Sequence, residues 1–159
     1  MDVWIGKKWC YQEKKILLLG ESWWGPQIPM QLYIGSWCSG NPDPFFTRIF
    51  NSCSGLNASG SSQNQKLYFW DNYAFMNFVF WSVGSTNSSK ATANDFKQAA
   101  IFLERYLRVL NPNSVWIIGK THSAYSQPVL TKLGIHCVVS NHPSSPITNV
   151  QLKSDFSKL

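Results

Sequence analysis

Three polar residues of this chain stand at or just inside the ends of short apolar segments, where each could take part in chemistry. Glu21 follows the aliphatic run ILLLG, Asn77 interrupts the aromatic run AFMNFVF, and His142 follows IHCVVSN. A carboxylate can position a water molecule, and an imidazole can donate a hydrogen bond to an oxygen that gains negative charge. An amide offers a donor and an acceptor side by side, so it suits a planar ligand that has both.

Each of these residues also has a purely structural interpretation. A glutamate after a strand can cap a helix or lie in solvent, an asparagine in a strand can bind a neighbouring loop, and HPSSP can be a simple turn. Joint placement at successive strand ends favours a site over three separate structural roles. Two further histidines are left out of the site. His136 lies within an expected strand and is expected to be a core residue, and His122, which follows the strand end Gly119-Lys120-Thr121, is only a minor candidate.

The elements that must position these residues are strands alternating with helices. Short apolar runs without alternation predict buried strands at 16–20, 74–80, 114–119 and 135–140. Helices are expected at 43–52, at 94–110, at 122–133 with an interruption at Pro128, and at 148–157. Loops are expected at 21–42 and 55–65. This order predicts one α/β domain over residues 1–159, three-layered α/β/α, with a mostly parallel four-stranded central sheet whose carboxyl edge binds ligands.

The helix expected at 94–110 has the clearest pattern in the chain. Thr92 and Asp95 are spaced as a capping box at its start, and the sequence Asn111-Pro112 ends it. Arg105 and Arg108 are expected to face solvent. The face toward the sheet should carry Phe96, Ala99, Ala100, Leu103, Tyr106, Leu107 and Leu110.

Charge and composition narrow the class of partner. The formal net charge of +6 favours a polyanion such as nucleic acid. Only eight Asp and Glu are present, with no two at nearby loop positions, which argues against a two-metal nuclease or polymerase site. The chain has no apolar leader and no run of membrane-spanning length, so it is expected in the cytoplasm, at the nucleoid or in a eukaryotic nucleus, with no membrane partner. It is also expected to be a monomer.

No cofactor or metal is expected from the sequence. The four cysteines form no CxxC pair and have no histidine at zinc spacing, and no GxGxxG sequence or P-loop follows a strand. The four cysteines are Cys10, Cys38, Cys53 and Cys137.

The sequence GESWWG at 20–25, the strand FMNFV and HPSS at 142–145 together resemble the uracil-DNA glycosylase superfamily. That superfamily has a motif of the kind G-[QEIM]-[DNA]-P-[YG] after its first strand and H-P-S after its last. PFFTRIF is similar to the helix that follows the first motif in the mismatch-specific branch. RVLNPNSVWIIG resembles the helix–strand step before the last motif, so the resemblance covers about residues 14 to 147.

The resemblance implies a monofunctional DNA N-glycosylase of base-excision repair. Such a hydrolase flips uracil or a modified or damaged pyrimidine out of DNA and cleaves its N-glycosidic bond. By this resemblance Asn77 would face O4 and N3 of the base, His142 would donate to O2, and Glu21 would act beside the sugar. Further substrate contacts would come from Gly20, Ser22, Trp23, Trp24 and Trp37. Further DNA contacts would come from Ser144, Ser145 and Ile147.

The chain departs from the motifs of the superfamily at several positions. Ser22 stands where the most active branches have Asp or Asn, and Trp23 replaces the usual proline. Glu21 matches a Glu of the iron–sulfur branch, but the cysteines of that branch are not supplied here. Two alternatives follow: a glycosylase-fold protein that binds DNA or a nucleobase without cutting, and a nucleotide or nucleoside hydrolase on a flavodoxin-like sheet.

Overall fold

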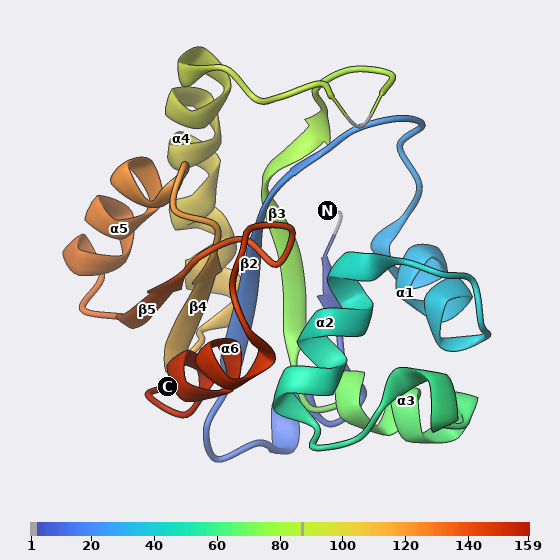
Figure 1. Ribbon diagram of the computed structural model, residues 1–159. Coiled ribbons are helices and arrows are strands. Elements are labelled where there is room, and N and C mark those ends of the chain that lie inside the picture. The colour runs from blue at the N-terminus through green and yellow to red at the C-terminus, as the bar shows by residue number, and fades with distance from the viewer. Residues whose placement is uncertain (1–2, 87) are drawn as a thin grey trace.

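A mixed sheet with helices on both of its faces forms the centre of the computed structural model, which describes residues 3–86 and 88–159 (Figure 1). Within those residues the sheet has five strands in the order β1-β3-β2-β4-β5. The strands are β1 (Trp4–Ile5), β2 (Ile16–Trp23), β3 (Ala74–Ser82), β4 (Ser114–Ile118) and β5 (His136–Ser140). All neighbouring pairs are parallel except β1 with β3. The predicted three-layer α/β/α class is confirmed.

Two groups of helices cover the two faces of the sheet (Figure 1). One face is covered by α1 (Met30–Cys38), α2 (Pro44–Cys53), α3 (Gln63–Trp70) and α6 (Asn149–Phe156). The other face is covered by α4 (Ala93–Leu110) and α5 (Ser123–Lys132). The side chain of Leu18 enters the first core while Leu17 and Leu19 enter the second, which explains why β2 is aliphatic without alternation.

The strand count differs from the prediction by β1. The four predicted strands form the parallel part of the sheet, and the two-residue β1 adds an antiparallel edge to β3. The indole N–H of Trp4 donates to the carbonyl of Trp70 at 2.9 Å, which fixes this edge from a distant part of the chain. A segment this short has no periodicity that sequence analysis could detect.

The predicted loops at 21–42 and 55–65 were wrong in part, because α1 lies within the first and α3 begins inside the second. α1 has no side-chain cap at Pro29, so its start carries no sequence signal, and it is stabilised by packing of Met30, Ile34 and Trp37 into the core. The predicted interruption of α5 at Pro128 is also wrong, because the helix runs through it. Pro128 is exposed, so the carbonyl left without an N–H partner can reach solvent.

The helix α4 agrees with its predicted pattern. Thr92 and Asp95 form the capping box, and Asn111 ends the helix in the left-handed region at φ 48°. Arg105 and Arg108 are exposed. The buried residues of the helix are Phe96, Ala99, Leu103, Leu107 and Leu110. Among the described residues, no helix is both long and apolar enough to cross a membrane.

Leu103→Ala should lower the free energy of unfolding by about 2–5 kcal/mol, because Leu103 is 1% exposed in the core between α4 and the sheet. Urea denaturation followed by circular dichroism measures this. Ile101→Ala is the matched control on the same helix, since Ile101 is 66% exposed and should change stability by no more than about 0.5 kcal/mol. A Leu103→Ala effect as small as that of the control would show that the packed face has been misidentified.

Candidate functional site

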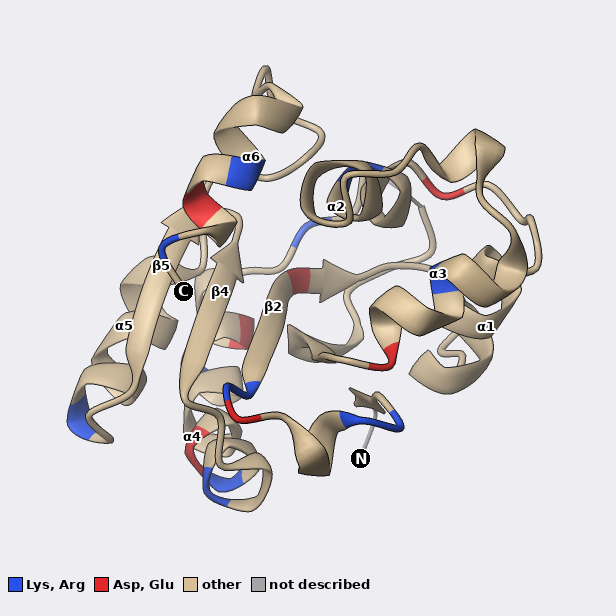
Figure 2. Cartoon of the chain, turned by 90° about the horizontal axis from the view of Figure 1, so that it is seen from below, with Lys and Arg blue, Asp and Glu red and all other residues tan. Residues whose placement is uncertain are grey.

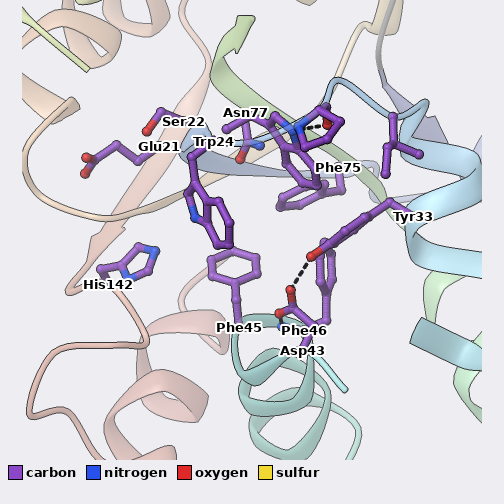
Figure 3. Close-up of a pocket in the computed structure, with 13 residues that line it drawn as sticks. Glu21, Ser22, Trp24, Tyr33, Asp43, Phe45, Phe46, Phe75, Asn77 and His142 are labelled. Atoms are coloured by element: carbon purple, nitrogen blue, oxygen red, sulfur yellow. Dashed lines mark hydrogen bonds between the residues drawn. The ribbon is translucent and has the colours of Figure 1, made fainter. Parts of the chain in front are cut away.

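A cavity of about 300 Å³ opens at the carboxyl edge of the parallel strands (Figure 3). Glu21 comes from β2, Asn77 from β3 and His142 from the loop after β5, so the structure brings the three predicted polar residues to one cavity. Its lining also includes Ser22, Trp23, Trp24, Pro26, Ile28, Tyr33, Asp43, Phe45, Phe46 and Phe75.

Asn77 reaches the cavity because its neighbour on β2 is a glycine. Gly20 pairs with Asn77 across the two strands, and a Cβ at Gly20 would lie 2.3 Å from Oδ1 of Asn77. Any larger residue at position 20 would therefore displace the amide. The Asn77 side chain is buried and makes no hydrogen bond with another residue of the described chain, so its donor and acceptor remain available to a ligand.

The hydrogen bonds of His142 determine which of its nitrogens carries the proton. Its Nδ1 accepts the backbone N–H of Ser144 at 3.1 Å, and the Ser144 hydroxyl lies 2.7 Å from the same nitrogen. Because a backbone N–H can only donate, Nδ1 has no proton and the neutral ring carries it on Nε2. Burial lowers the pKa of His142, against an opposing effect of the Glu21 charge. The site therefore contains a neutral imidazole with one N–H free to donate.

Arg48 of α2 holds the loop that carries His142. Its guanidinium donates to the carbonyls of Pro143 and Ile147, and a third carbonyl, that of Ser145, lies at 3.5 Å. Within the described chain Arg48 forms no ion pair with a carboxylate. Sequence analysis missed this residue, because an arginine in the middle of a helix gives no signal of a contact 95 residues away.

Arg48→Met should lower the free energy of unfolding by about 1–3 kcal/mol, because it leaves partly buried carbonyls of the 143–147 loop without a donor. Hydrogen exchange of the loop amides should rise at the same time, which distinguishes local loosening from a general loss of stability. Arg105→Met is the control on an exposed helix face and should stay within about 0.5 kcal/mol of wild type. Unchanged exchange in the loop of Arg48→Met would contradict the role assigned to the guanidinium.

Glu21 lies over the end of β4. Its Oε2 is 3.3 Å from the point that a Cβ on Gly119 would occupy, and Gly119 has φ +119°, a conformation that favours glycine. The Glu21 carboxylate makes no hydrogen bond within the described chain, so it can accept one from a ligand or water. A side chain at position 119 would push the carboxylate away from this position.

His122 lies behind the cavity and is not part of its lining. Its ring is fully buried, stacks on Phe78 at 5.2 Å and leaves Nε2 without a hydrogen-bond partner in the described chain. Burial lowers the pKa of His122 to about 4. His122 is therefore neutral at physiological pH and is a core residue beside the site.

The free energy of unfolding should fall at acid pH because His122 is buried. The His122 ring takes up a proton near pH 6.5 in the unfolded chain but only near pH 4 in the folded chain. The contribution of His122 to the stability of the folded chain is therefore complete above pH 6.5 and is lost as the pH falls to 4. The loss amounts to about 3 kcal/mol. Urea denaturation at pH 7 and pH 4 should show this amount as a difference between wild type and His122→Phe. An equal pH dependence in wild type and His122→Phe would disprove the assignment.

Six of the residues that line the cavity are Phe, Tyr or Trp. Phe45 and Phe75 lie 5.8 Å apart, and Phe45 lies 5.5 Å from the His142 ring at an angle of 33°. Trp24 is 50% exposed at the mouth, whereas the N–H of Trp23 is satisfied by the carbonyl of Pro26 at 2.9 Å. Flat apolar surfaces of this kind can hold a planar ring by stacking.

Tyr33 and Asp43 form a polar pair in the lining that sequence analysis did not place there. The Tyr33 hydroxyl donates to Oδ2 of Asp43 at 2.6 Å, and Oδ1 of Asp43 accepts the N–H of Phe46 at 3.0 Å as the N-cap of α2. Burial, and then the hydrogen bond and charge of Asp43, raise the pKa of Tyr33 above its ordinary value. Asp43 is the first residue of the helix predicted at 43–52, and Tyr33 lies in the loop predicted at 21–42.

Two residues expected at the site lie in the core instead. Trp37 is 3% exposed, and its N–H donates to the Thr47 hydroxyl, so it does not line the cavity. Ile147 is 7% exposed and packs with the core of α2 and α6, so it is not available for the predicted DNA contact in this conformation. Both side chains are apolar, and both are buried in the core rather than exposed at the cavity. Ser144 is exposed and Ser145 is partly buried in the His142 loop.

The expected position of His136 is also wrong, because this residue lies at the surface. It was expected in the core as part of β5, but it is exposed, and its Nε2 lies 3.0 Å from the carbonyl of Lys158. β5 is the edge strand, so one of its faces is only partly covered.

No metal-ligand set is formed by the side chains that the structure describes. No group of three or more His, Cys, Asp or Glu within residues 3–86 and 88–159 lies close enough to hold an ion. The four cysteines are unpaired, and burial raises the pKa of Cys38 to about 11 and that of Cys53 to about 12.

The chemical capacity of the cavity follows from its groups. Aromatic rings can stack on a planar ring, the amide of Asn77 can pair with its edge, and the N–H of His142 can stabilise negative charge on an oxygen. The Glu21 carboxylate can hold a water molecule or stabilise positive charge. The chain matches no protein-family model, and a search of curated proteins finds no match.

Proposed function

We propose that the protein is a monofunctional DNA glycosylase that receives uracil or a modified pyrimidine flipped out of DNA and hydrolyses its N-glycosidic bond. The observation that carries this proposal is the neutral His142 ring, whose free Nε2–H shares an aromatic cavity with the unpaired amide of Asn77. Uracil needs this combination, because its edge has a donor at N3 and an acceptor at O4 and its O2 becomes negative as the bond breaks.

In the proposed reaction the base stacks against Phe45 and Phe75 while Asn77 pairs with N3 and O4. The bond between C1′ and N1 breaks, and its electron pair stays on the base, where the Nε2–H of His142 stabilises the charge on O2. Glu21 stabilises the cationic sugar and positions a water molecule. The water oxygen bonds to C1′ and its proton passes through Glu21 to solvent, while the base takes a proton and leaves.

Attraction to DNA is supported by the net charge rather than by one patch. The formal charge is +6, and Figure 2 shows Lys and Arg spread over α2, α3, α4, α5, α6 and the N-terminal segment. A positive field of this kind speeds encounter with a polyanion without specifying sequence. The protein would act as a monomer wherever DNA is found, in the cytoplasm at the nucleoid or in a nucleus.

The direct test is cleavage of defined oligonucleotides. Purified protein is incubated with single- and double-stranded DNA that carries uracil, modified uracil, hypoxanthine or modified cytosine, and alkali then breaks the strand at abasic sites. We expect breaks at one or more of the pyrimidines and none at hypoxanthine, because the amide and imidazole match a pyrimidine edge. The double variant Glu21→Gln, His142→Ala controls for a contaminating glycosylase. Binding without breaks at any pyrimidine would reject the enzyme.

The second candidate is a glycosylase-like protein that binds DNA or a nucleobase without cutting. Ser22 favours it, since this cavity residue has a short hydroxyl in place of the acid or amide of the active branches. A hydroxyl is a poor base at neutral pH. This candidate would be established if the wild type binds uracil-containing DNA with the same affinity as the Glu21→Gln, His142→Ala variant and cleaves none of it.

A further inference from the structure

The end of the cavity formed by α1 and the start of α2 has a chemistry of its own. Three aromatic residues line the cavity there together with Asp43. Tyr33 lies edge-to-face on Trp23 with centroids 4.5 Å apart, and Phe46 lies 5.6 Å from Tyr33. Oδ2 of Asp43 is held by the Tyr33 hydroxyl at 2.6 Å. This cluster of Trp23, Tyr33, Asp43 and Phe46 lines the same cavity as Asn77 and His142.

Every side-chain polar hydrogen of this cluster is already used. The Tyr33 hydroxyl and the Phe46 N–H donate to Asp43, and the indole N–H of Trp23 donates to the Pro26 carbonyl. What remains for a ligand is the unused lone pairs of the Asp43 carboxylate and the Tyr33 oxygen, which only accept. A ligand group that reaches this end must therefore bring donors.

The charge of the cavity lining also favours a ligand group that brings donors. The lining contains two carboxylates, Glu21 and Asp43, and no Lys or Arg, although the chain as a whole is +6. Aromatic rings in the same cavity as a carboxylate favour an ammonium group, since a ring face attracts a cation as the carboxylate does. A cationic donor would therefore fit this end better than a neutral one.

We propose that Trp23, Tyr33, Asp43 and Phe46 form an ammonium subsite and that the protein selects pyrimidines with an aminoalkyl group at C5. This inference rests on the proposed function, because it takes the ring orientation from the roles of Asn77 and His142. It names the substrate class that the proposed function leaves open.

The position of the subsite agrees with the shape of the base. Figure 3 shows Glu21 and His142 toward one side of the cavity, Tyr33 and Asp43 toward the other, and Trp24 and Phe45 between them. C5 lies directly across a pyrimidine ring from C2. A ring whose O2 faces His142 therefore directs its C5 substituent toward Tyr33 and Asp43. A primary alkylamine there is protonated at pH 7, as a lysine side chain is.

The test compares two free bases that differ in the last group of the substituent. Binding of 5-aminomethyluracil and 5-hydroxymethyluracil is measured at pH 7 by calorimetry, which requires no cleavage. The wild type should bind the amine about 10-fold more tightly, the scale of a partly desolvated cation–π contact with a carboxylate. Asp43→Asn should reduce this preference to about 2-fold or less, because asparagine still caps α2 but carries no charge.

Two further variants complete the experiment. Glu104→Gln changes the net charge equally on α4, outside the cavity lining, and should keep the 10-fold preference. Trp23→Leu removes one ring without touching the helix cap and should also reduce the preference, which keeps the test decisive if Asp43→Asn is unstable. Equal affinity of wild type for the two bases, or a preference that survives in folded Asp43→Asn, would overturn the subsite.

Cleavage assays separate this proposal from the proposed function. Oligonucleotides with uracil, 5-hydroxymethyluracil or 5-aminomethyluracil are incubated with the wild type. Cleavage of all three at equal rates would leave the glycosylase and overturn the selectivity. Tight, Asp43-dependent binding of the amine without cleavage would keep the subsite and reject the glycosylase.

Discussion

His142→Ala should slow the chemical step by about 10²–10³-fold, the range for losing one preorganised donor to a developing anion. Single-turnover cleavage of the oligonucleotide that proves to be the substrate measures this step. Affinity for an uncleavable analogue should change much less, because the hydrogen bond from Nε2 strengthens mainly as charge develops on O2. His136→Ala is the matched control, since His136 is an exposed histidine outside the cavity lining.

The same mechanism predicts a pH profile. Catalysis requires the neutral form of His142, and burial lowers its pKa, so the neutral form persists as pH falls below the ordinary value of about 6.5. The wild-type rate should therefore stay above half of its maximum at pH 6.5. A half-maximal rate above pH 7 on the acid side, or a rate unaffected by His142→Ala, would contradict a neutral donor at this position.

Glu21→Gln should slow the chemical step by about 10²–10⁴-fold while leaving affinity for an uncleavable substrate nearly unchanged. The amide matches the shape of the carboxylate, and so it keeps the contact over Gly119 but loses the charge that stabilises the sugar cation and orients water. A large loss would show that Glu21 supplies the acid that Ser22 cannot. Glu13→Gln, at an exposed position of the N-terminal segment, controls for the change in net charge.

The two variants together test the whole mechanism. If cleavage of the substrate survives in both Glu21→Gln and His142→Ala at wild-type rates, the proposed chemistry is wrong, although the fold is unaffected. If only His142→Ala is impaired, the leaving base is stabilised as proposed and the water is positioned by another group. Ser22→Ala would then identify whether the hydroxyl that lines the cavity is that group.

The sequence by itself determined the central frame of this protein. Short apolar runs with no alternation can be stable only when both of their faces are covered, so they predicted the parallel strands. α4 was determined in the same way, since its capping box and its apolar face are both local patterns. Because parallel strands share one carboxyl edge, this frame also predicted that Glu21, Asn77 and His142 would meet.

Only the tertiary structure decided what surrounds these three residues. Trp37 and Ile147 look like surface contacts in a motif, but burial of apolar area against distant helices places them in the core. Tyr33 enters the cavity because α1 forms by packing rather than by a local signal, and Asp43 receives a second role from that packing.

The contacts of Arg48 show the physical reason for this division. Its guanidinium binds carbonyls 95 and 99 residues further along the chain, and such a pairing exists only once α2 and the His142 loop are side by side. Local patterns reflect the hydrogen-bonding period of a single element, and they determine strands and helices. The walls of the cavity depend on which elements pack together, which no short window of sequence contains.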